Sequence, residues 1–370
     1  MSTLKVTNLQ HPSAAAANVT LDSSGNAAFS GGISGVTSVN GGQLGALNLI
    51  QNGAVAISQR GTSFSPPTTG AYVVDRFHQY QGGGGVLYYE QSTDAPAGFS
   101  NSLKVTVNTA DTSIASSDFY FMRQNIEGLN CTPLSLGTSD AVTFTLSFYV
   151  KSSLTGTFNG CFQNGAADRS YVYEYTINAA NTWERKTVTL VGDTTGTWFS
   201  DNRSGLRVTF DFGMGSSFNT TANSWQTGNY HSTSGTVKLV GTAGATWQIT
   251  GVMLETGDTA TSYPHEDYGT TLQKCQRYYQ RIYYTYEGNF GASGNGAPHE
   301  TALPVSLRGN PSITSSEITK GGTVSALSSI DAKNTGSAGA PLYTYLNVAL
   351  IFSGAGYGYY LAYVYADAEL

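Results

Sequence analysis

The sequence is poor in charged residues. Only 11% of its 370 residues are Asp, Glu, Lys or Arg, which is less than half of the roughly 25% that is usual in soluble domains. Disordered tails depend on high charge to stay in solution, so this composition argues against one. A monomer with so little charge is also poorly protected against association. We therefore expect a homo-oligomer whose subunits cover much of each other's surface.

Positive charge in excess, metal-ligand spacing and long apolar runs are also missing. The formal net charge of -6 leaves no basic face for phosphates, which disfavours nucleic-acid binding. Three cysteines and five scattered histidines without metal spacing predict no disulfide framework, no metal and no cofactor. Buried free thiols and histidines on the surface or in loops are the favoured interpretation. The only apolar cluster near the N-terminus, residues 14–17, is too short for a signal segment, and no run is long enough to insert into a membrane.

What the sequence has in abundance is short segments of alternating apolar and polar residues. Between residues 141 and 151, one face of a strand would carry Val142, Phe144, Leu146, Phe148 and Val150. Similar strands are predicted at residues 102–107, 183–190, 206–212 and 246–255, separated by segments rich in Gly, Asn, Asp and Ser. No helical pattern of convincing length interrupts them. This pattern predicts an all-β fold whose central part is a β-sandwich or jelly roll.

Composition divides the chain into three predicted parts. In residues 1–46, Asp22 is the only charged side chain after Lys5, and two short strands are predicted at 19–21 and 27–29. We interpret this part as an extended N-terminal arm that anchors the protein and oligomerises; a flexible leader is the alternative. Residues 47–268 form the sandwich. Residues 269–370 form a smaller C-terminal β domain that begins with a helical turn or two at 269–276 and ends with strands at 342–352 and 357–364, whose link has the composition of a hairpin.

No arrangement of residues indicates catalysis, and we expect that the protein is not an enzyme. Glycan hydrolysis needs two converging carboxylates, and no spacing singles out a pair among Glu174, Asp211 and Glu255. Asp193 and Asp258 are conceivable ligands of a structural Ca²⁺, but carboxylates that stabilise turns are more common. The metal is left unassigned. The glycine run at 82–85 lacks the elements of a phosphate loop and predicts a bend between strands.

Aromatic residues are the strongest indication of binding. Trp225 and Tyr230 lie in the polar segment 213–235 and are candidate glycan contacts on an exposed loop, with packing beneath the loop as the alternative for Trp225. Trp183 and Trp247 head regular strands and are predicted to lie in the core. A second candidate surface, which is equally compatible with packing between subunits, consists of Tyr343, Tyr345, Tyr357, Tyr359, Tyr360, Tyr363 and Tyr365.

Several segments, in order along the chain, resemble a group of marine and cyanobacterial phage proteins, the tail fibre or virion structural proteins. Residues 4–14 with 21–25 look like the N-terminal leader of this group, and residues 48–54, 59–61 and 75–77 look like the start of its central domain. Its later markers are similar to residues 149–156, 191–198, 249–255 and 274–279. Phe77 departs from the Trp that is common in the group, and residues 287–370 match only through the terminal residues 367–370.

The resemblance implies a virion protein with a central sandwich like that of carbohydrate-binding modules. We expect a tail fibre or spike subunit, assembled in the host cytoplasm, as a homotrimer in the virion. Its residues 1–46 would dock on other tail or capsid proteins, and its distal part would contact host surface glycans. A purely architectural collar, tail-adaptor or capsid-decorating protein is the alternative, and a glycan depolymerase ranks third.

Overall fold

The computed structural model describes residues 48–290, 294–295, 299–334 and 343–370, together with five short strands nearer the N-terminus. The chain divides into two compact units, Met1–Ala46 and Leu47–Leu370. In the first unit, β1 (Asn8–Leu9), β2 (Val19–Leu21) and β3 (Ala27–Phe29) form an antiparallel sheet, and β4 (Ser38–Val39) pairs with β5 (Gly42–Gln43). The two strands predicted in this part are confirmed, and its anchoring role stays a prediction.

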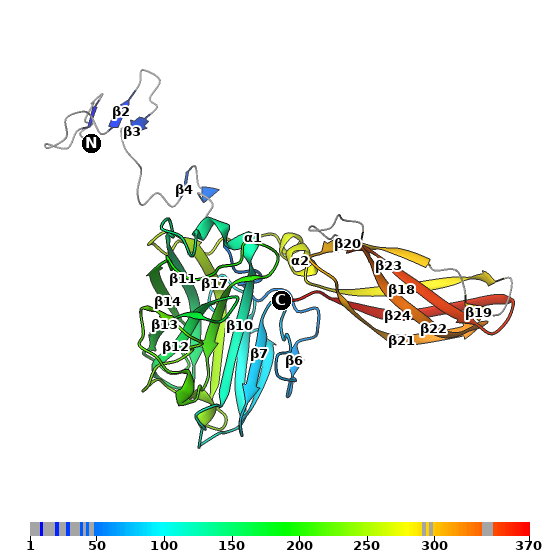
Figure 1. Cartoon of the computed structure of the whole chain (residues 1–370), viewed down its shortest axis with the longest axis horizontal. Helices are drawn as coiled ribbons and strands as arrows, with labels where there is room; N and C mark the ends of the chain where they lie inside the picture. Colours follow the sequence, from blue (N-terminus) through cyan, green and yellow to red (C-terminus); the bar gives the residue numbers. More distant parts are fainter. Residues whose placement is uncertain are drawn as a thin grey trace. The chain divides into compact units, whose positions relative to one another are not determined.

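The central part of the second unit consists of two six-stranded antiparallel sheets (Figure 1). The first, which we name the β10 sheet, has the order β16-β13-β12-β15-β10-β7. Its strands are β7 (His78–Gly82), β10 (Phe119–Glu127), β12 (Gly156–Asn164), β13 (Arg169–Ile177), β15 (Ser204–Asp211) and β16 (Trp225–Thr227).

The second sheet, which we name the β17 sheet, has the order β14-β11-β17-β9-β8-β6. Its strands are β6 (Ser63–Phe64), β8 (Val86–Ser92), β9 (Ser102–Thr109), β11 (Thr143–Ser152), β14 (Glu184–Val191) and β17 (Thr246–Thr256). The five strands predicted in the sandwich are all present, as β9, β11, β14 and β17 of this sheet and β15 of the β10 sheet. The bend predicted at the glycine run is also confirmed, because β7 ends at Gly82 and β8 begins at Val86.

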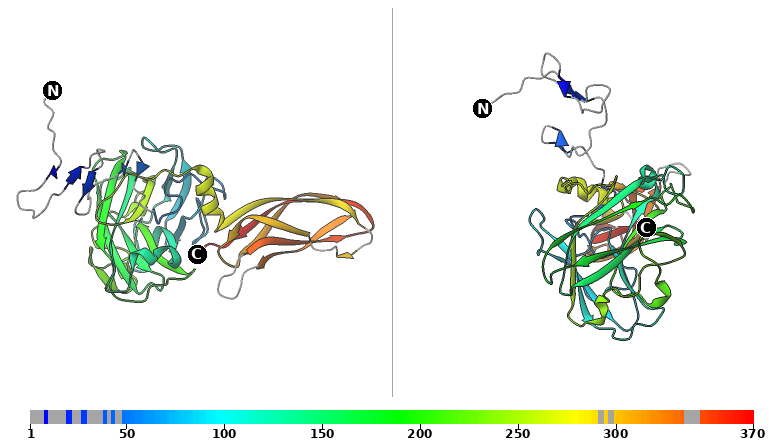
Figure 2. Two further views of the ribbon diagram at one scale, coloured as in Figure 1. Left: turned by 90° about the horizontal axis from the view of Figure 1, so that it is seen from above. Right: turned by 90° about the vertical axis from the view of Figure 1, so that its left-hand side faces the viewer.

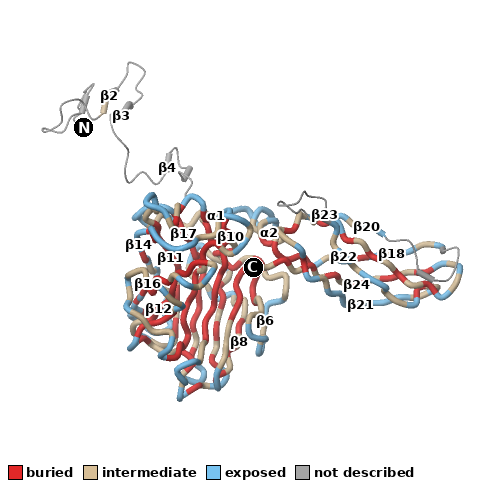
Figure 3. The backbone as a smooth tube through the Cα atoms, viewed as in Figure 1, coloured by how far each residue is buried: buried red, intermediate tan, exposed pale blue. Residues whose placement is uncertain are grey.

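The core of the sandwich is a continuous apolar cluster to which both sheets contribute, and buried residues run along its strands (Figure 3). Phe148 of the β17 sheet meets Phe210 of the β10 sheet edge-on, with ring centroids 5.3 Å apart. Trp247 is fully buried and its Nε1 donates to the hydroxyl of Tyr175 at 3.1 Å. The buried face of β11 carries Phe144, Leu146, Phe148 and Val150, as its period of two predicts. The predicted all-β sandwich is confirmed.

Helices are few and short in the described residues. They are α1 (Gly128–Cys131), α2 (Tyr268–Gln276) and the 3-10 turns η1 (Thr132–Leu134), η2 (Ser216–Phe218) and η3 (Leu239–Gly241). The carboxylate of Asp267 caps α2 by accepting from the amides of Gly269 and Thr270, at 2.8 and 3.3 Å. This confirms the helical turns predicted at 269–276. None of the helices described here has the length and apolar character needed to cross a membrane.

The C-terminal part is two further layers of strands with their own core (Figures 1 and 2). One sheet has the order β18-β24-β21, from β18 (Tyr279–Phe290), β24 (Gly356–Asp367) and β21 (Ser312–Gly322). In the other, β23 (Tyr343–Phe352) pairs with β19 (Gly294–Asn295), β20 (His299–Leu307) and β22 (Val324–Asn334). The buried residues between the layers include Leu346, Val348, Leu350, Tyr360 and Val364.

The predicted hairpin between the last two strands is wrong. β23 and β24 belong to different sheets, so the link at 353–356 carries the chain from one layer to the other. Thr323 holds this crossing: its carbonyl accepts from the amide of Ser353, and its amide donates to the carbonyl of Tyr357. A Gly-rich link predicts a tight turn, but it does not specify which strands pair on either side of it.

Several predictions about single side chains were also decided by the structure. Cys131, Cys161 and Cys275 are buried free thiols, as expected. The placement of Trp183 in the core is wrong, because it is half-buried outside the apolar cluster and its Nε1 donates to Asp94 at 3.3 Å.

Surface or loop placement is wrong for His78, which lies in strand β7 and is 2% exposed. His231 lies in a loop, as predicted, but it is only 3% exposed because it packs against the outer face of the β10 sheet. His265 and His299 are exposed, as predicted, and His11 lies outside the described residues.

Candidate functional site

The outer face of the β10 sheet, opposite the core, is unusually rich in buried polar and aromatic groups. In the strand register, Arg123 stands between His78 and Thr209, and Phe121 stands between Tyr80 and Asp211. Because side chains alternate along a strand, these residues point away from the core that Met122, Val208 and Phe210 help to form. A sheet of a sandwich needs only one apolar face for the core. The outer face can therefore have a second role, such as binding a ligand.

Part of the segment 213–235 crosses this outer face and is hydrogen-bonded to it. Asn159 Nδ2 donates to the carbonyl of His231 at 2.8 Å, and Gln163 Nε2 donates to Asn229 Oδ1 at 2.8 Å. Ser170 Oγ donates to the carbonyl of Gly228 at 2.5 Å. Residues 228–233 are therefore held on the sheet and are not a free loop.

Trp225 lies at the edge of the sandwich, in strand β16. It pairs with Tyr171 in the register, and its ring packs edge-on against the rings of Tyr171 and Trp198, at 5.3 and 5.5 Å between centroids. Its Nε1 donates at 2.9 Å to the carbonyl of Val191, which belongs to the opposite sheet. The half-buried indole thus closes the space between the two sheets, which is the packing alternative considered above for this residue.

Tyr230 lies on the outer face instead. Its amide donates to Ser170 Oγ at 3.0 Å, and its half-buried ring rests on Gly228, where a Cβ would come within 2.6 Å of the ring. The two candidate glycan contacts therefore lie on opposite faces of the sheet and do not form one site. A role of either residue in binding glycans stays a prediction.

The three carboxylates considered for catalysis do not converge. Asp211 is buried, which raises its pKa, and it accepts from the amide of Gly213 and from Ser232 Oγ at 2.6 and 2.7 Å. Glu174 is exposed and accepts from Thr233 Oγ1 at 2.5 Å. Glu255 belongs to the other sheet, where it accepts from the amide and the hydroxyl of Thr261. On the β10 sheet, these carboxylates hold the crossing segment in place.

The carboxylates considered for calcium are engaged as well. Asp193 accepts from Arg169 through both oxygens, at 2.6 and 2.9 Å, and Asp258 accepts from the hydroxyl of the adjacent Thr259. Within the described residues, no group of three or more His, Cys, Asp or Glu side chains is placed to hold a metal ion.

Basic side chains gather on the outer face of the β10 sheet, which sequence reasoning did not identify. Arg123 is buried, and burial together with the nearby Arg207 lowers its pKa to about 10. Burial, reinforced by Arg123, also lowers the pKa values of His78 and His231 well below the usual range. Arg123, Arg207 and His78 lie in strands and His231 lies in the segment that crosses them. The alternation of residues in a strand says nothing about the segments that cover it.

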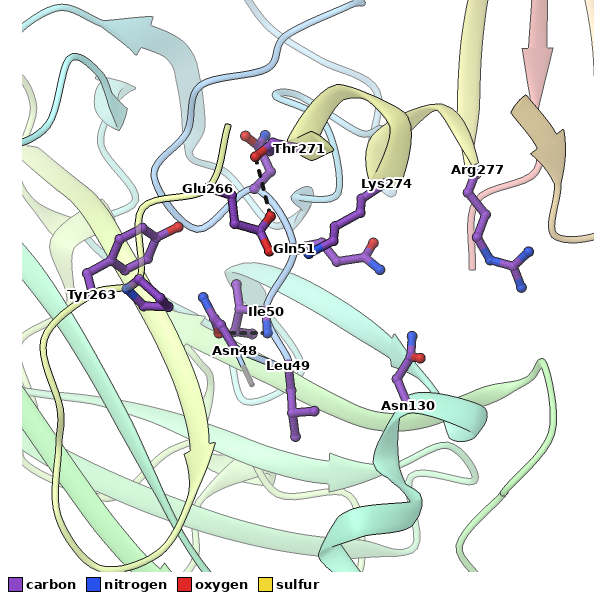
Figure 4. A pocket seen from close by; sticks show the side chains of 12 residues that line it. Asn48, Leu49, Ile50, Gln51, Asn130, Tyr263, Glu266, Thr271, Lys274 and Arg277 are labelled. Carbon is purple, nitrogen blue, oxygen red and sulfur yellow. Dashed lines mark hydrogen bonds and ion pairs between the residues drawn. The ribbon is translucent and has the colours of Figure 1, made fainter. Parts of the chain in front are cut away.

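A pocket of about 270 Å³ lies between residues 48–52 and helix α2 (Figure 4). Two of the amide side chains on its wall are already used: Asn48 Oδ1 accepts from the backbone amides of Ile50 and Leu254, and Asn52 is hydrogen-bonded to Ile57 and Asp75. The charges are paired too, because Lys274 contacts Glu266 and Arg277 contacts Glu127. The pocket therefore offers few free groups to a ligand.

The C-terminal tyrosines do not form one surface. Tyr360 is buried in the core, whereas Tyr357 and Tyr345 are 51% and 41% exposed and lie in different sheets. Tyr363 is half-buried and meets Tyr283 of β18, with ring centroids 5.6 Å apart. The outer face of β18 and β24 thus carries an exposed group of aromatic rings.

Two antiparallel sheets packed around one apolar core define an all-β sandwich protein. No protein-family model matches the sequence, and no curated protein matches it. Among solved structures, the chain is similar to the enzymatically active domain of tailspike protein 4 of bacteriophage CBA120, at 12% identity and a TM-score of 0.31, over 57% of this chain and 21% of that chain.

It is also similar to two carbohydrate-binding modules. One is the family 11 module from Clostridium thermocellum in complex with a β-1,3-1,4-mixed-linked tetrasaccharide, at 10% identity and a TM-score of 0.27, over 55% of this chain and 99% of that chain. The other is the CBM22-1 xylan-binding domain from Paenibacillus barcinonensis Xyn10C, at 11% identity and a TM-score of 0.25, over 58% and 97%. At these TM-scores the similarities assign neither a family nor an activity, and the fold class rests on the strand pairing of the chain itself.

Proposed function

We propose that the chain is a structural, non-enzymatic subunit of a bacteriophage particle, a tail fibre or spike protein, whose central sandwich contacts host surface glycans. The observation that carries the glycan contact is the outer face of the β10 sheet. There, half-buried Tyr80 stacks on Phe121 at 4.8 Å beside hydrogen-bonding side chains. Aromatic rings next to polar groups are the combination that sugars bind, because a sugar has an apolar face and a rim of hydroxyls.

The place in a virion is supported by the ordered segments that resemble phage virion proteins. The residues 1–46 form a compact unit of their own, as expected of a part that docks on other tail or capsid proteins. The low charge supports a homo-oligomer, and we propose a homotrimer. Native mass spectrometry of the full chain tests this part, and a stable monomer would refute the trimer.

Glycan binding is tested on an array of bacterial surface glycans with three forms of the full chain. We expect the unmodified chain to bind, Tyr80→Ala to lose about tenfold in affinity, as expected for a stacking ring, and Tyr88→Ala to bind normally. Tyr88 is the matched control, because it is a half-buried tyrosine on strand β8 of the other sheet. Equal losses in both variants would contradict a site on the β10 sheet.

An architectural collar, tail-adaptor or capsid-decorating protein is the second candidate. The observation in its favour is that residues 228–233 are hydrogen-bonded over part of the outer face. Locating the subunit in images of intact particles, together with adsorption assays on particles that lack it, distinguishes the two roles. The absence of enzymatic activity is tested by measuring reducing sugars released from host polysaccharide.

A further inference from the structure

The outer face of the β10 sheet holds two arginines that no carboxylate in the described part of the chain neutralises. Within the described residues, every ion pair involves other side chains, and neither Arg123 nor Arg207 has an acidic partner within 4 Å. Arg123 is 8% exposed and Arg207 is half-buried. A buried charge without a counter-charge is costly, so structures normally pair it.

The two arginines are close neighbours in the β10 sheet. Asn125 of β10 pairs with Arg207 of β15, and Arg123 pairs with Thr209. The arginines are therefore diagonal neighbours in the sheet, with backbones about 7–8 Å apart, within reach of each other's long side chains. Both point outward, since the residues between them, Gln124 and Val208, belong to the opposite face.

Their hydrogen bonds leave the positive charge uncompensated. Arg123 donates to Thr209 Oγ1 at 3.0 Å and to Gln163 Oε1 at 2.9 Å, both neutral oxygens. Arg207 donates to the carbonyl of Gly165 at 2.7 Å, while its buried Nε has no partner. A guanidinium carries five donors, so donors remain for an incoming acceptor.

Aromatic rings lie next to Arg123 and its register partner His78. The guanidinium carbon of Arg123 lies 4.8 Å from the ring centre of Phe121 and 5.7 Å from that of Tyr80. His78, the register partner of Arg123, stacks on Tyr72 with ring centroids 4.6 Å apart. Because Tyr80 and Arg207 are both half-buried, the group reaches the surface at these two side chains.

We propose that Arg123 and Arg207 bind the anionic group of an acidic saccharide, a carboxylate or a sulfate, while Tyr80 packs against the sugar ring. Arginine suits this role because its planar fork binds carboxylate and sulfate oxygens in pairs. This inference rests on the proposed glycan contact and adds to it the charge of the ligand. The proposal also explains why two unpaired arginines lie on the outer face, which does not contribute to the apolar core.

The test compares two saccharides with the same sugar backbone, hexagalacturonate and its uncharged methyl ester, by titration calorimetry with the full chain. We expect the acid form to bind at least tenfold more tightly, as charge-assisted hydrogen bonds predict, and the difference to shrink as salt is raised. Arg207→Gln should abolish the preference. The matched control is Arg185→Gln, which removes an exposed arginine of β14, also without a carboxylate partner, from the other sheet.

A second measurement separates this inference from the proposed function. Inorganic sulfate should raise the melting temperature of the unmodified chain and of Arg185→Gln, but not that of Arg207→Gln. If sulfate has this effect and neither saccharide binds, the anion site stands and the glycan contact falls. If both saccharides bind equally, or if Arg207→Gln keeps the preference and the sulfate effect, the anion site is refuted while the glycan contact stands.

Discussion

Arg76 in the central sandwich and Glu369 near the end of the chain form an ion pair in which both side chains are almost fully buried, at 1% and 4% exposure. The guanidinium carbon of Arg76 lies 3.4 Å from the ring centre of Tyr278, and its Nη2 donates to the carbonyl of Asn125. Burial alone would lower the pKa of Arg76, but Glu369 raises it above the ordinary value. The terminal residues are thus fixed to the sandwich by charge.

Glu369→Gln should therefore destabilise the protein. Removing one partner leaves a buried cation without compensation, and we expect a loss of about 3–5 kcal/mol in the free energy of unfolding, measured in urea. The control is Glu90→Gln, which breaks the half-exposed pair with Lys104 and should cost about 1 kcal/mol or less. Similar losses in the two variants would contradict a structural role of the buried pair.

Stability should fall as the pH drops below about 6.5. The pKa values of His78 and His231 are lowered by burial, so the unfolded chain takes up protons near pH 6.5 that the folded chain does not. The stability these neutral side chains provide is present above that pH and lost below it, by about 2 kcal/mol for both together between pH 6 and 5.

Urea unfolding at a series of pH values measures this slope, and His231→Gln should roughly halve it. The comparison with the variant cancels the opposite contribution of Asp211, whose pKa burial raises. An unchanged slope in the variant would show that His231 is protonated in the folded protein.

Trp225→Ala should cost more stability than Tyr230→Ala. The indole joins the two sheets and contacts Trp198, so we expect a loss of about 2 kcal/mol. Tyr230 packs only on Gly228 and the outer face, and its removal should cost about 1 kcal/mol or less. Thermal or urea unfolding measures both. If Tyr230→Ala also weakens binding on the glycan array, the predicted contact between Tyr230 and the glycan is supported. Unchanged binding would show that Tyr230 does not contact the glycan.

The three thiols should be unreactive in the folded protein. Burial raises the pKa values of Cys131 and Cys161 to about 12 and that of Cys275 well above its ordinary value, and only the thiolate is a good nucleophile. Iodoacetamide at pH 8 should label none of them in buffer and all three in urea, as counted by mass spectrometry. Labelling in buffer would show that the covering segments open.

Local periodicity predicted several of the strands but not their partners. The alternation at 141–151 placed β11 and its buried face, because side-chain direction within a strand depends only on neighbouring residues. The link at 353–356 also has local turn character, yet β23 pairs with the preceding strand β22 and with β19 and β20, whereas β24 pairs with β18 and β21. Pairing depends on contacts between distant segments, which composition does not encode.

The candidate site shows the same limit. The segment of Trp225 and Tyr230 is polar and rich in Gly, Ser and Asn, and this composition, a property of the sequence alone, predicts exposed rings. Whether each ring packs or is exposed depends on what lies across from it: Val191 and Trp198 for Trp225, and Ser170 for Tyr230.

By itself, the sequence determined that the chain is an all-β protein with a central sandwich and buried free thiols, because strand periodicity and composition are local properties. Only the tertiary structure decided that Arg123 and Arg207 share one face without a counter-charge and that Glu369 neutralises Arg76 instead. Charges pair only when they lie close together in space. Residues that are far apart in the sequence come close together only when the sheets form.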